Sequence, residues 1–288
     1  IWKSVVKKDK RYAIAWFNLG ILNYYDKKFD EAVTYFTKAL KYNNRLVDAY
    51  VLLGRTYLQI GQIKNGLENF KEAYDINPDH QGAWGSYAYG LVENGDTLKA
   101  IEILERYPKN REALSMLGTL HAAQKKYQEA RDAFLKAIDF GGESDNLLGI
   151  GFIYMEEKNC TQALQIYKTY FEKEPEPIAD SYINAGVAAR ECDDLKAAQT
   201  FFENGLHRYP HDPILQYNTG QMMFHNQQYD RAEELWKMMG DSLMDPQVLY
   251  LRALSAWNRG EVNAAEKLIL QSLSIDTKAE YYDLLGTI

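Results

Sequence analysis

The sequence predicts an all-α protein built from repeated pairs of antiparallel helices. Three stretches share one spacing: "AWFNLGILNYYDKKFDEAVTYFTKAL" at 15–40, "AYVLLGRTYLQIGQIKNGLENFKEAY" at 49–74 and "QYNTGQMMFHNQQYDRAEELWKMM" at 216–239. Each has a bulky residue, then Gly four positions later, then a small residue followed by an aromatic one. The chain also has only 19 Gly and 7 Pro in 288 residues, which suits helices. A unit repeated at a fixed period indicates an array that grows by stacking.

Eight units follow when the chain is aligned on its small residues, and the first two are each 34 residues long. Their predicted ranges are 13–46, 47–80, 81–110, 111–143, 144–178, 179–212, 213–245 and 246–278. Residues 1–12 are predicted to end a preceding second helix, and residues 279–288 to begin a ninth unit. Because an array needs polar capping units and neither end has one, we expect the chain to be a fragment of a longer array.

The pattern within a unit predicts two amphipathic helices that form a hairpin. Counted from the first residue of a unit, positions 4, 7, 8 and 11 share one face of a first helix, and positions 20, 24 and 27 share one face of a second. Position 8 is Gly or Ala in every unit, and position 20 is Ala or Gly. Gly inside a helix costs about 1 kcal/mol relative to Ala. We therefore expect these small residues to let the two helix backbones approach closely.

Irregular features cluster between about residues 105 and 180. Pro108 arrives about one helical turn early, so the third unit is 30 residues long, and the fourth ends in "FGGES" in place of a proline. One interpretation is drift that loops tolerate. The other is a change of superhelical geometry within residues 81–180, which divides the array in two.

Charge and hydropathy exclude two classes of partner. Residues 1–80 carry 13 Lys/Arg against 9 Asp/Glu, and the remaining 208 residues carry 20 against 31. This balance does not provide the continuous basic stripe that nucleic acid requires. The longest apolar stretch, "LLGIGFIYM" at 147–155, is about half of the roughly 20 residues that span a bilayer. We expect neither nucleic-acid binding nor a membrane span.

No catalytic, metal or cofactor motif is present in the sequence. The five histidines lack a ligand spacing, and "GIG" at 149–151 lacks the third glycine of a dinucleotide loop. Cys160 and Cys192 are too far apart for a CxxC pair, so we expect two buried, unpaired thiols and a reducing, cytoplasmic location. "NCT" at 159–161 fits a glycosylation acceptor, which would matter only in a secreted chain.

The repeated unit resembles the tetratricopeptide repeat family, with its bulky, Leu, Gly and aromatic first helix, its Ala/Phe/Ala second helix and its terminal proline. The resemblance covers all eight units and implies a right-handed α-solenoid, the superhelix typical of this family. It also implies a non-enzymatic scaffold without a cofactor, which binds a peptide or a partner helix in its concave groove. In members of this family, the first-helix positions 2, 5, 6, 9, 12 and 13 typically face that partner.

The resemblance also implies candidate peptide-binding residues. Position 6 is asparagine in three units, and a primary amide can pair with the N–H and C=O of an extended peptide. The alternative is that these asparagines are merely tolerated. Units six and seven are the favoured site, because two such asparagines occur there in succession. The candidate residues are Asn184, Asn218, Arg190, Tyr217, Gln221, Phe224, His225 and, in the first unit, Asn18.

The middle of the predicted groove is apolar. Exposed apolar residues in a groove are typical of partner contacts, and methionine packs adaptably. The alternative is that adjacent units cover these side chains. The candidates are Leu52, Tyr89, Met116, Phe152 and Met155, with Val51 and Leu148 beside them.

Two other hypotheses stay open at this point. The array could recruit substrates for a larger enzyme whose catalytic domain lies outside this sequence. It could also self-associate through its open ends.

Overall fold

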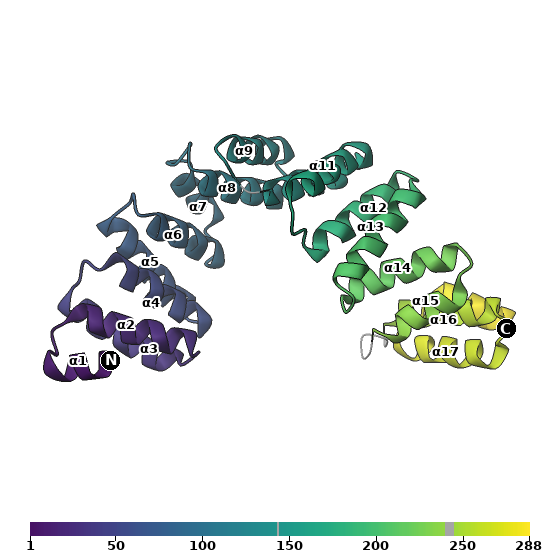
Figure 1. The fold of residues 1–288 in the computed structure, drawn as a ribbon, viewed down its shortest axis with the longest axis horizontal. Coiled ribbons are helices and arrows are strands. Elements are labelled where there is room, and N and C mark those ends of the chain that lie inside the picture. Colours follow the sequence, from purple (N-terminus) through teal and green to yellow (C-terminus); the bar gives the residue numbers. More distant parts are fainter. Residues whose placement is uncertain (143, 240–244) are drawn as a thin grey trace. The chain divides into compact units, whose positions relative to one another are not determined.

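Helices joined by short turns make up the part of the chain that its computed structural model describes, residues 1–142, 144–239 and 245–288 (Figure 1). These residues form eighteen helices and no β-strand, so the predicted all-α class is confirmed. The first helices of the pairs are α2 (Ala13–Tyr25), α4 (Val47–Gln59), α6 (Gln81–Glu93), α8 (Arg111–Ala123), α10 (Asp145–Glu156), α12 (Ala179–Glu191), α14 (Pro213–His225) and α16 (Pro246–Asn258). The second helices are α3 (Phe29–Tyr42), α5 (Ile63–Ile76), α7 (Thr97–Leu104), α9 (Tyr127–Asp139), α11 (Cys160–Lys173), α13 (Leu195–Arg208), α15 (Tyr229–Lys237) and α17 (Val262–Ile275). The flanking helices are α1 (Trp2–Lys8) and α18 (Ala279–Thr287).

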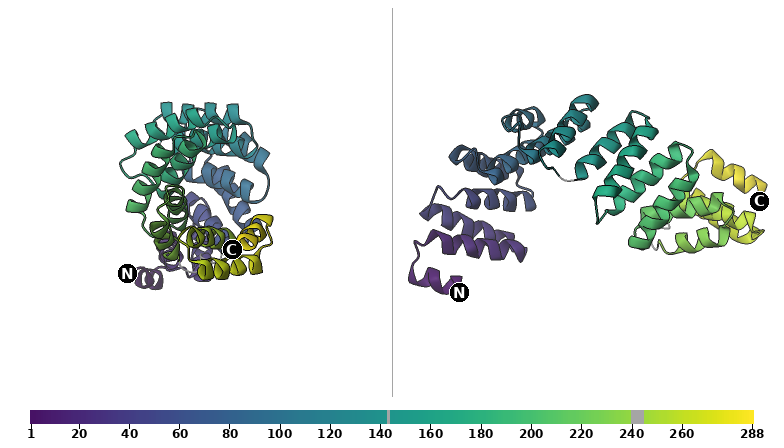
Figure 2. Two further views of the ribbon diagram at one scale, coloured as in Figure 1. Left: turned by 90° about the vertical axis from the view of Figure 1, so that its right-hand side faces the viewer. Right: turned by 45° about the horizontal axis from the view of Figure 1, so that its top comes forward.

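The chain divides into two compact bodies, an N-terminal body of residues 1–146 and a C-terminal body of residues 147–288. Within each body, every second helix packs on the first helix of the next pair (Figure 2). Successive first helices also touch at α2 and α4, α4 and α6, α12 and α14, and α14 and α16. The division falls inside the span 81–180, where the sequence was irregular. The change of superhelical geometry expected there stays a prediction, and Glu143 of "FGGES" lies outside the described residues.

The glycine at position 8 of a first helix makes room for the aromatic ring at position 24 of the second helix. A Cβ atom added at Gly20 would lie 2.5 Å from the Phe36 ring, and one added at Gly118 would lie 2.6 Å from the Phe134 ring. Four more pairs show the same close approach: Gly54 with Phe70, Gly151 with Tyr167, Gly186 with Phe202, and Gly220 with Trp236. In these six pairs the glycine therefore brings the helix backbone against a ring. The expected close approach of two backbones occurs in the second unit, where a Cβ atom added at Gly54 would also lie 2.9 Å from the Gly66 carbonyl oxygen.

The two units without glycine at position 8 support this explanation. They have Ala88 and Ala253 there, and their position 24 is aliphatic, Leu104 and Ile269 respectively. Both aliphatic side chains are fully buried, as the rings are in most other pairs. A methyl group on the first helix is thus matched by a smaller side chain on the second, which keeps the volume between the helices filled.

The turn between the helices of each pair is closed by one residue in the left-handed region. It is glycine in three units, Gly61, Gly95 and Gly260. In the other five it is Lys27, Lys125, Lys158, Asp193 and Gln227, with φ between 58° and 61°. The next backbone N–H then bonds a carbonyl five residues earlier, as Asn159 N bonds Tyr154 O at 2.8 Å. This is the Schellman arrangement that ends many helices.

Tyrosine side chains tie the ends of some second helices to the preceding pair. The short helix α7 stops at Leu104, and Tyr107 beyond it donates its hydroxyl to Pro78 O at 2.6 Å. The Tyr107 ring also stacks on Trp84, with the ring centroids 4.8 Å apart. Tyr209 repeats the bond in the C-terminal body, donating to Pro177 O at 2.8 Å.

Helix α15 is also short, with nine residues against fourteen in α13, and the sequence did not single it out. A buried ion pair connects it to the following helix. Arg252 on α16 donates Nη2–H and Nε–H bonds of 2.8 and 3.0 Å to the two carboxylate oxygens of Glu233. Such a bidentate pair fixes the direction in which two helices meet.

The expectation of two separate, buried thiols was wrong, because Cys160 and Cys192 form a disulfide. Cys160 is the first residue of α11, and Cys192 caps the end of α12, so the bond connects the helix turns of successive units. Their Cα atoms are 5.6 Å apart, within the usual range for a disulfide. The junction between the seventh and eighth units has a hydrogen bond in the equivalent place, from Arg259 to Tyr229 O at 3.3 Å.

Enlarging Gly118 should destabilise the N-terminal body. We expect Gly118→Ala to lower the free energy of unfolding by about 1 to 3 kcal/mol, because the new methyl group overlaps the Phe134 ring. Adding Phe134→Leu recreates the natural Ala88 and Leu104 combination. The double variant should therefore lose less than the two single losses added together, with a coupling of roughly 1 kcal/mol or more. Denaturant unfolding of the three variants measures this.

Gly85→Ala is the matched control, since a Cβ there meets nothing within 4 Å. Its stability should rise by roughly 0.5 to 1 kcal/mol, the ordinary gain of Ala over Gly in a helix. Equal losses at Gly85 and Gly118 would show that the ring is not the cause.

Opening the disulfide should destabilise the C-terminal body. The bond closes a sequence separation of 32 residues, for which loop entropy gives roughly 3 to 4 kcal/mol. Cys160→Ser with Cys192→Ser should lower the unfolding midpoint, and reductant should do the same to the natural chain. Reductant should leave the double variant unchanged. A reductant effect of equal size on the variant would contradict this.

Candidate functional site

The candidate site lies on the first-helix face, the surface formed by the first helices within one body. In the N-terminal body it comprises α2, α4, α6 and α8, and in the C-terminal body mainly α12, α14 and α16. The second helices pack behind it and contribute the rings that fill the interior. Side chains at positions 2, 5, 6, 9, 12 and 13 lie on these first helices, and some of them, such as Phe224 at position 12, still pack against the second helix of their own pair.

An open recess in the N-terminal body, the Arg55 recess, spans three successive first helices. It holds about 350 Å³, a volume in the range of small-ligand or side-chain sites. Arg55 crosses it and donates to Ser86 Oγ at 3.4 Å. Within the described residues, no carboxylate lies within 4.0 Å of the Arg55 guanidinium. The lining residues are Tyr24, Arg55, Leu58, Gln59, Phe70, Gly85, Ser86 and Tyr89.

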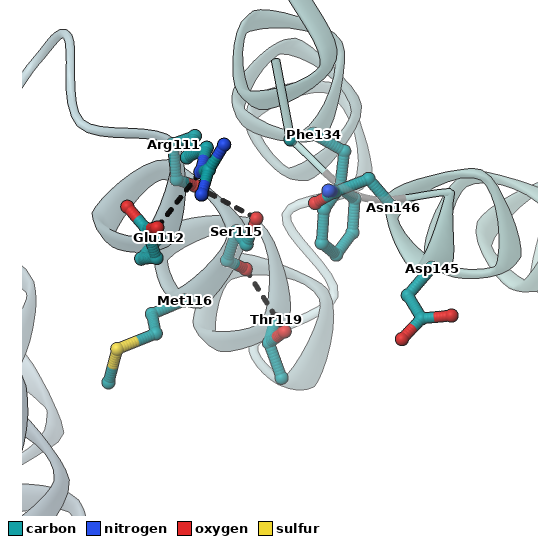
Figure 3. Close-up of a pocket in the computed structure, with 9 residues that line it drawn as sticks. Arg111, Glu112, Ser115, Met116, Thr119, Phe134, Asp145 and Asn146 are labelled. Carbon is teal, nitrogen blue, oxygen red and sulfur yellow. Dashed lines mark hydrogen bonds and ion pairs between the residues drawn. The ribbon is translucent and has the colours of Figure 1, made fainter. Parts of the chain in front are cut away.

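A second recess of about 350 Å³ lies over α8 (Figure 3). Figure 3 shows that α8 supplies most of its wall, with Phe134 behind and Asp145 and Asn146 on the opposite side. Arg111 donates to Glu112 Oε1 at 2.9 Å, and this bond holds the pKa of the Glu112 carboxyl below its ordinary value. The positive charge of Arg111 is therefore already paired with the Glu112 carboxylate.

A hydrogen-bonded chain crosses from α12 to α14 in the C-terminal body. Arg190 donates to Gln221 Oε1 at 3.2 Å and to Asn218 Oδ1 at 3.4 Å. Gln221 Nε2 in turn donates to the Tyr217 hydroxyl oxygen at 2.8 Å. The structure thus brings together four of the predicted residues, which we call the Arg190 chain.

The Arg190 chain ends in a phenol that stays protonated. Burial is the main cause that raises the pKa of Tyr217, and Asp245 adds to the shift, while Arg190 and Lys278 oppose it. The hydroxyl accepts from Gln221, and in the described part of the chain its own proton has no acceptor. No carboxylate of the described residues lies within 4.0 Å of Arg190. The Arg190 chain is therefore a row of hydrogen-bond donors that ends in an O–H group without an acceptor among the described residues.

The three predicted asparagines have different environments. Asn218 is only 6% exposed, and it donates to Ile214 O in its own helix at 2.9 Å while accepting from Arg190. Asn18 likewise donates to its own helix, to Ile14 O at 2.9 Å. Asn184 is half-buried, and its amide makes no hydrogen bond within the described residues. Of the three, Asn184 is the amide most available to a ligand.

Phe224 and His225 lie at the end of α14. Phe224 packs edge-on against Tyr229, with the ring centroids 5.4 Å apart, and tilts against Trp236. It therefore contributes mainly to the interior. His225 is exposed and touches the Phe224 ring.

The predicted apolar residues belong to both bodies. Leu52, Tyr89 and Met116 lie in the N-terminal body, and Phe152 and Met155 in the C-terminal body. Tyr89 is 50% exposed and Phe152 is 49% exposed, whereas Leu52 and Met155 are half-buried against core clusters. Val51, named beside them, is buried at 5% exposure, so a groove position for Val51 was wrong.

Sequence reasoning missed Arg55 and Arg111 as residues that line recesses. Arg55 occupies position 9, one of the positions that the family resemblance assigns to the partner, so its position could have identified it. Nothing in the local pattern showed that Arg55 lacks a nearby carboxylate. That depends on which side chains the neighbouring units bring close.

Comparison with known proteins identifies the repeat. Models of the tetratricopeptide repeat match residues 13–46, 47–80, 88–145 and 183–237. The chain belongs to the tetratricopeptide repeat family. Arrays of this repeat are protein-interaction scaffolds and are generally not catalytic, which agrees with the predicted class of function. Within the described residues, no group of three or more His, Cys, Asp or Glu side chains could hold a metal ion.

Two human proteins illustrate the relationship. Tetratricopeptide repeat protein 6 from Homo sapiens is 25% identical over 218 residues, covering 72% of this chain and 34% of that protein. Protein O-mannosyl-transferase TMTC3 from Homo sapiens is 23% identical over 260 residues, covering 82% of this chain and 28% of that protein. The chain thus spans about a third of the length of these relatives.

Solved structures share the fold of this tetratricopeptide repeat chain. The APC/C hetero-tetramer Cut9–Hcn1 matches with a TM-score of 0.58 and 18% identity, over 90% of this chain and 52% of that one. A tetratricopeptide repeat protein from Parabacteroides merdae matches with a TM-score of 0.55 and 16% identity, over 83% and 97%. In the part of the chain that the structure describes, no helix is both long and apolar enough to cross a membrane.

The two asparagines of units six and seven should differ in their contribution to stability. Asn218→Ala removes a buried amide with its two hydrogen bonds, to Ile214 O and from Arg190, at about 0.5 to 1.5 kcal/mol each, so we expect a loss of about 1 to 3 kcal/mol. Asn184→Ala should change stability by less than about 0.5 kcal/mol. Thermal unfolding of the two single variants measures the difference. Equal losses would mean that the Asn218 bonds contribute little.

Proposed function

We propose that this scaffold binds an extended partner peptide on its first-helix face, and that the Arg190 chain recognises an acidic or carbonyl group of that peptide. The observation that carries the proposal is the row of donors from Arg190 through Gln221 to the Tyr217 hydroxyl. Hydrogen bonds in a chain polarise one another. The terminal O–H is therefore a strong donor, and a carboxylate or a peptide carbonyl is the matching acceptor.

Asn184 supports the same proposal. It lies on α12, the helix that also carries Arg190, and its amide can both donate to and accept from a peptide backbone. Successive first helices are roughly 10 Å apart, a distance that about three extended residues span. One short peptide segment can therefore reach both Asn184 and the Tyr217 hydroxyl.

The Arg55 recess provides a second contact point for a long partner. Arg55 is a cation without a carboxylate neighbour among the described residues, and Tyr24 and Tyr89 flank it. Aromatic rings beside an arginine favour recognition of an acidic or aromatic side chain. A relative of the same fold, the Cut9–Hcn1 hetero-tetramer, is itself an assembly with a second protein, which is consistent with a protein partner here.

The location of the binding surface can be tested by site-specific photo-crosslinking. A photoreactive phenylalanine analogue replaces Tyr89 or Phe152 on first helices, and Leu135 or Leu270 on second helices serves as the control. The four side chains are matched in exposure, at 50%, 49%, 49% and 49% respectively. We expect one partner to crosslink from the first-helix positions alone. Crosslinking of the same partner mainly from Leu135 and Leu270 would overturn the proposal.

The role of the donor row can then be tested with the crosslinked partner's own peptide. Tyr217→Phe removes only the hydroxyl, so binding should weaken roughly tenfold or more, as expected when a bond to a charged group is lost. Tyr282→Phe, on the exposed surface of α18, is the control and should bind normally. Unchanged binding by Tyr217→Phe would contradict recognition by this hydroxyl.

A second candidate function follows from the match to TMTC3, which is named a transferase. The chain covers 28% of that protein, so it could be a substrate-recruiting arm of a larger enzyme. Such an arm would use the same first-helix face, and its partner would be modified by the full-length protein. Self-association through the ends of the array is a further prediction, which light scattering at several concentrations tests.

A further inference from the structure

The tripeptide Asn159-Cys160-Thr161 lies outside the first-helix face. It combines an acceptor sequence for a covalent modification with a disulfide-bonded cysteine. It is the one place in the 288-residue sequence where asparagine is followed by a non-proline residue and then by Ser or Thr. That pattern is the acceptor sequence for N-linked glycosylation. Its central residue, Cys160, is half of the disulfide with Cys192.

The surroundings of Asn159 suit attachment of a sugar. The side chain is exposed in the turn between α10 and α11, next to Lys158 with its left-handed backbone. Asn159 Oδ1 accepts from Gln162 N at 3.2 Å and so caps α11. Within the described residues, Nδ2 makes no hydrogen bond. A glycosylated amide keeps its carbonyl oxygen, so the cap and the sugar are compatible.

The hydroxyl-bearing residue of the tripeptide is also accessible. Thr161 is exposed at the start of α11, and its Oγ1 lies 3.9 Å from Cys192 Sγ. The acceptor sequence is therefore at the surface over its whole length, except for the half-buried Cys160. Sites of N-linked glycosylation lie in such surface turns.

The disulfide is an independent observation that indicates the same compartment. Its two sulfurs belong to half-buried residues at helix ends. Glutathione and thioredoxin keep such thiols reduced in the cytosol, whereas secretory compartments oxidise them. If the acceptor sequence were a chance match, nothing would require its central residue to be a disulfide-bonded cysteine.

We propose that Asn159 is an N-glycosylation site and that this part of the chain matures in an oxidising secretory compartment. In the first reaction, Asn159 Nδ2 bonds to C1 of a lipid-pyrophosphate-linked oligosaccharide. The C1–O bond breaks, the lipid pyrophosphate leaves, and the amide loses one proton. In the second reaction, Cys160 and Cys192 lose two protons and pass two electrons to a disulfide oxidant, which is reduced to a dithiol.

This proposal is independent of peptide binding. Asn159 occupies the helix turn of the fifth unit, outside the Arg55 recess and the Arg190 chain. A scaffold in any compartment could bind a peptide on its first-helix face. Failure of either proposal therefore leaves the other intact.

Peptide mapping of the natural full-length protein from its own cells tests the site directly. Free thiols are alkylated before lysis, and peptides around residues 159 and 192 are then analysed with and without peptide-N-glycosidase. We expect a glycan at Asn159, conversion of Asn159 to Asp on enzyme treatment, and cysteines that alkylate only after reduction. An unmodified Asn159 overturns the assignment of the glycosylation site. Thiols that alkylate without prior reduction overturn the assignment to an oxidising compartment.

Variants of the full chain in the same cells separate the acceptor sequence from folding. Asn159→Gln and Thr161→Ala should each lose the glycosidase-sensitive mass, whereas Thr161→Ser keeps the acceptor sequence and should retain it. All three should keep the Cys160–Cys192 disulfide. Its detection in each variant would show that the variant folds. A glycosidase-sensitive mass that persists in Asn159→Gln would place the sugar on another residue and overturn the assignment.

Discussion

The contact between a position-8 residue and the position-24 side chain behind it is the constraint on which every helix pair depends. The ring can enter the space between the helices only where the first helix has no Cβ atom, as at Gly20 under Phe36. The two pairs with alanine, at Ala88 and Ala253, have Leu104 and Ile269 in place of the ring. Each pair therefore reaches the same packed volume by a matched choice on both helices. The spacing of the helices within a pair follows from that choice.

Contacts between pairs are more varied than contacts within them. Tyr107 and Tyr209 bond proline carbonyls of the preceding pair, Arg252 reaches Glu233, and one junction is covalent, between Cys160 and Cys192. Because the units of a repeat array touch only their neighbours, each of these contacts acts on one junction. The array can thus combine uniform pairs with individually adjusted junctions.

This division of roles explains where the candidate binding residues are found. The interior is filled by the repeated small and aromatic residues, which leaves the first-helix face free to vary. Arg55 and Arg190 lie there without carboxylate partners among the described residues, and the Tyr217 hydroxyl has an unused proton. Residues that the core does not need are the ones that can recognise a partner.

The sequence by itself determined the helix pairs, because the periods of 3.6 residues within a helix and about 34 along the chain are local properties. The family resemblance that this pattern carries also placed Arg190, Tyr217, Asn218 and Gln221 at partner-facing positions of the first helices. Only the tertiary structure decided that Asn218 is buried while Asn184 is available, and that Cys160 meets Cys192. Those outcomes depend on how the turn of one unit lies beside the next. That geometry arises from contacts between residues some 30 positions apart, such as the 32 that separate the cysteines, and no helical period encodes it.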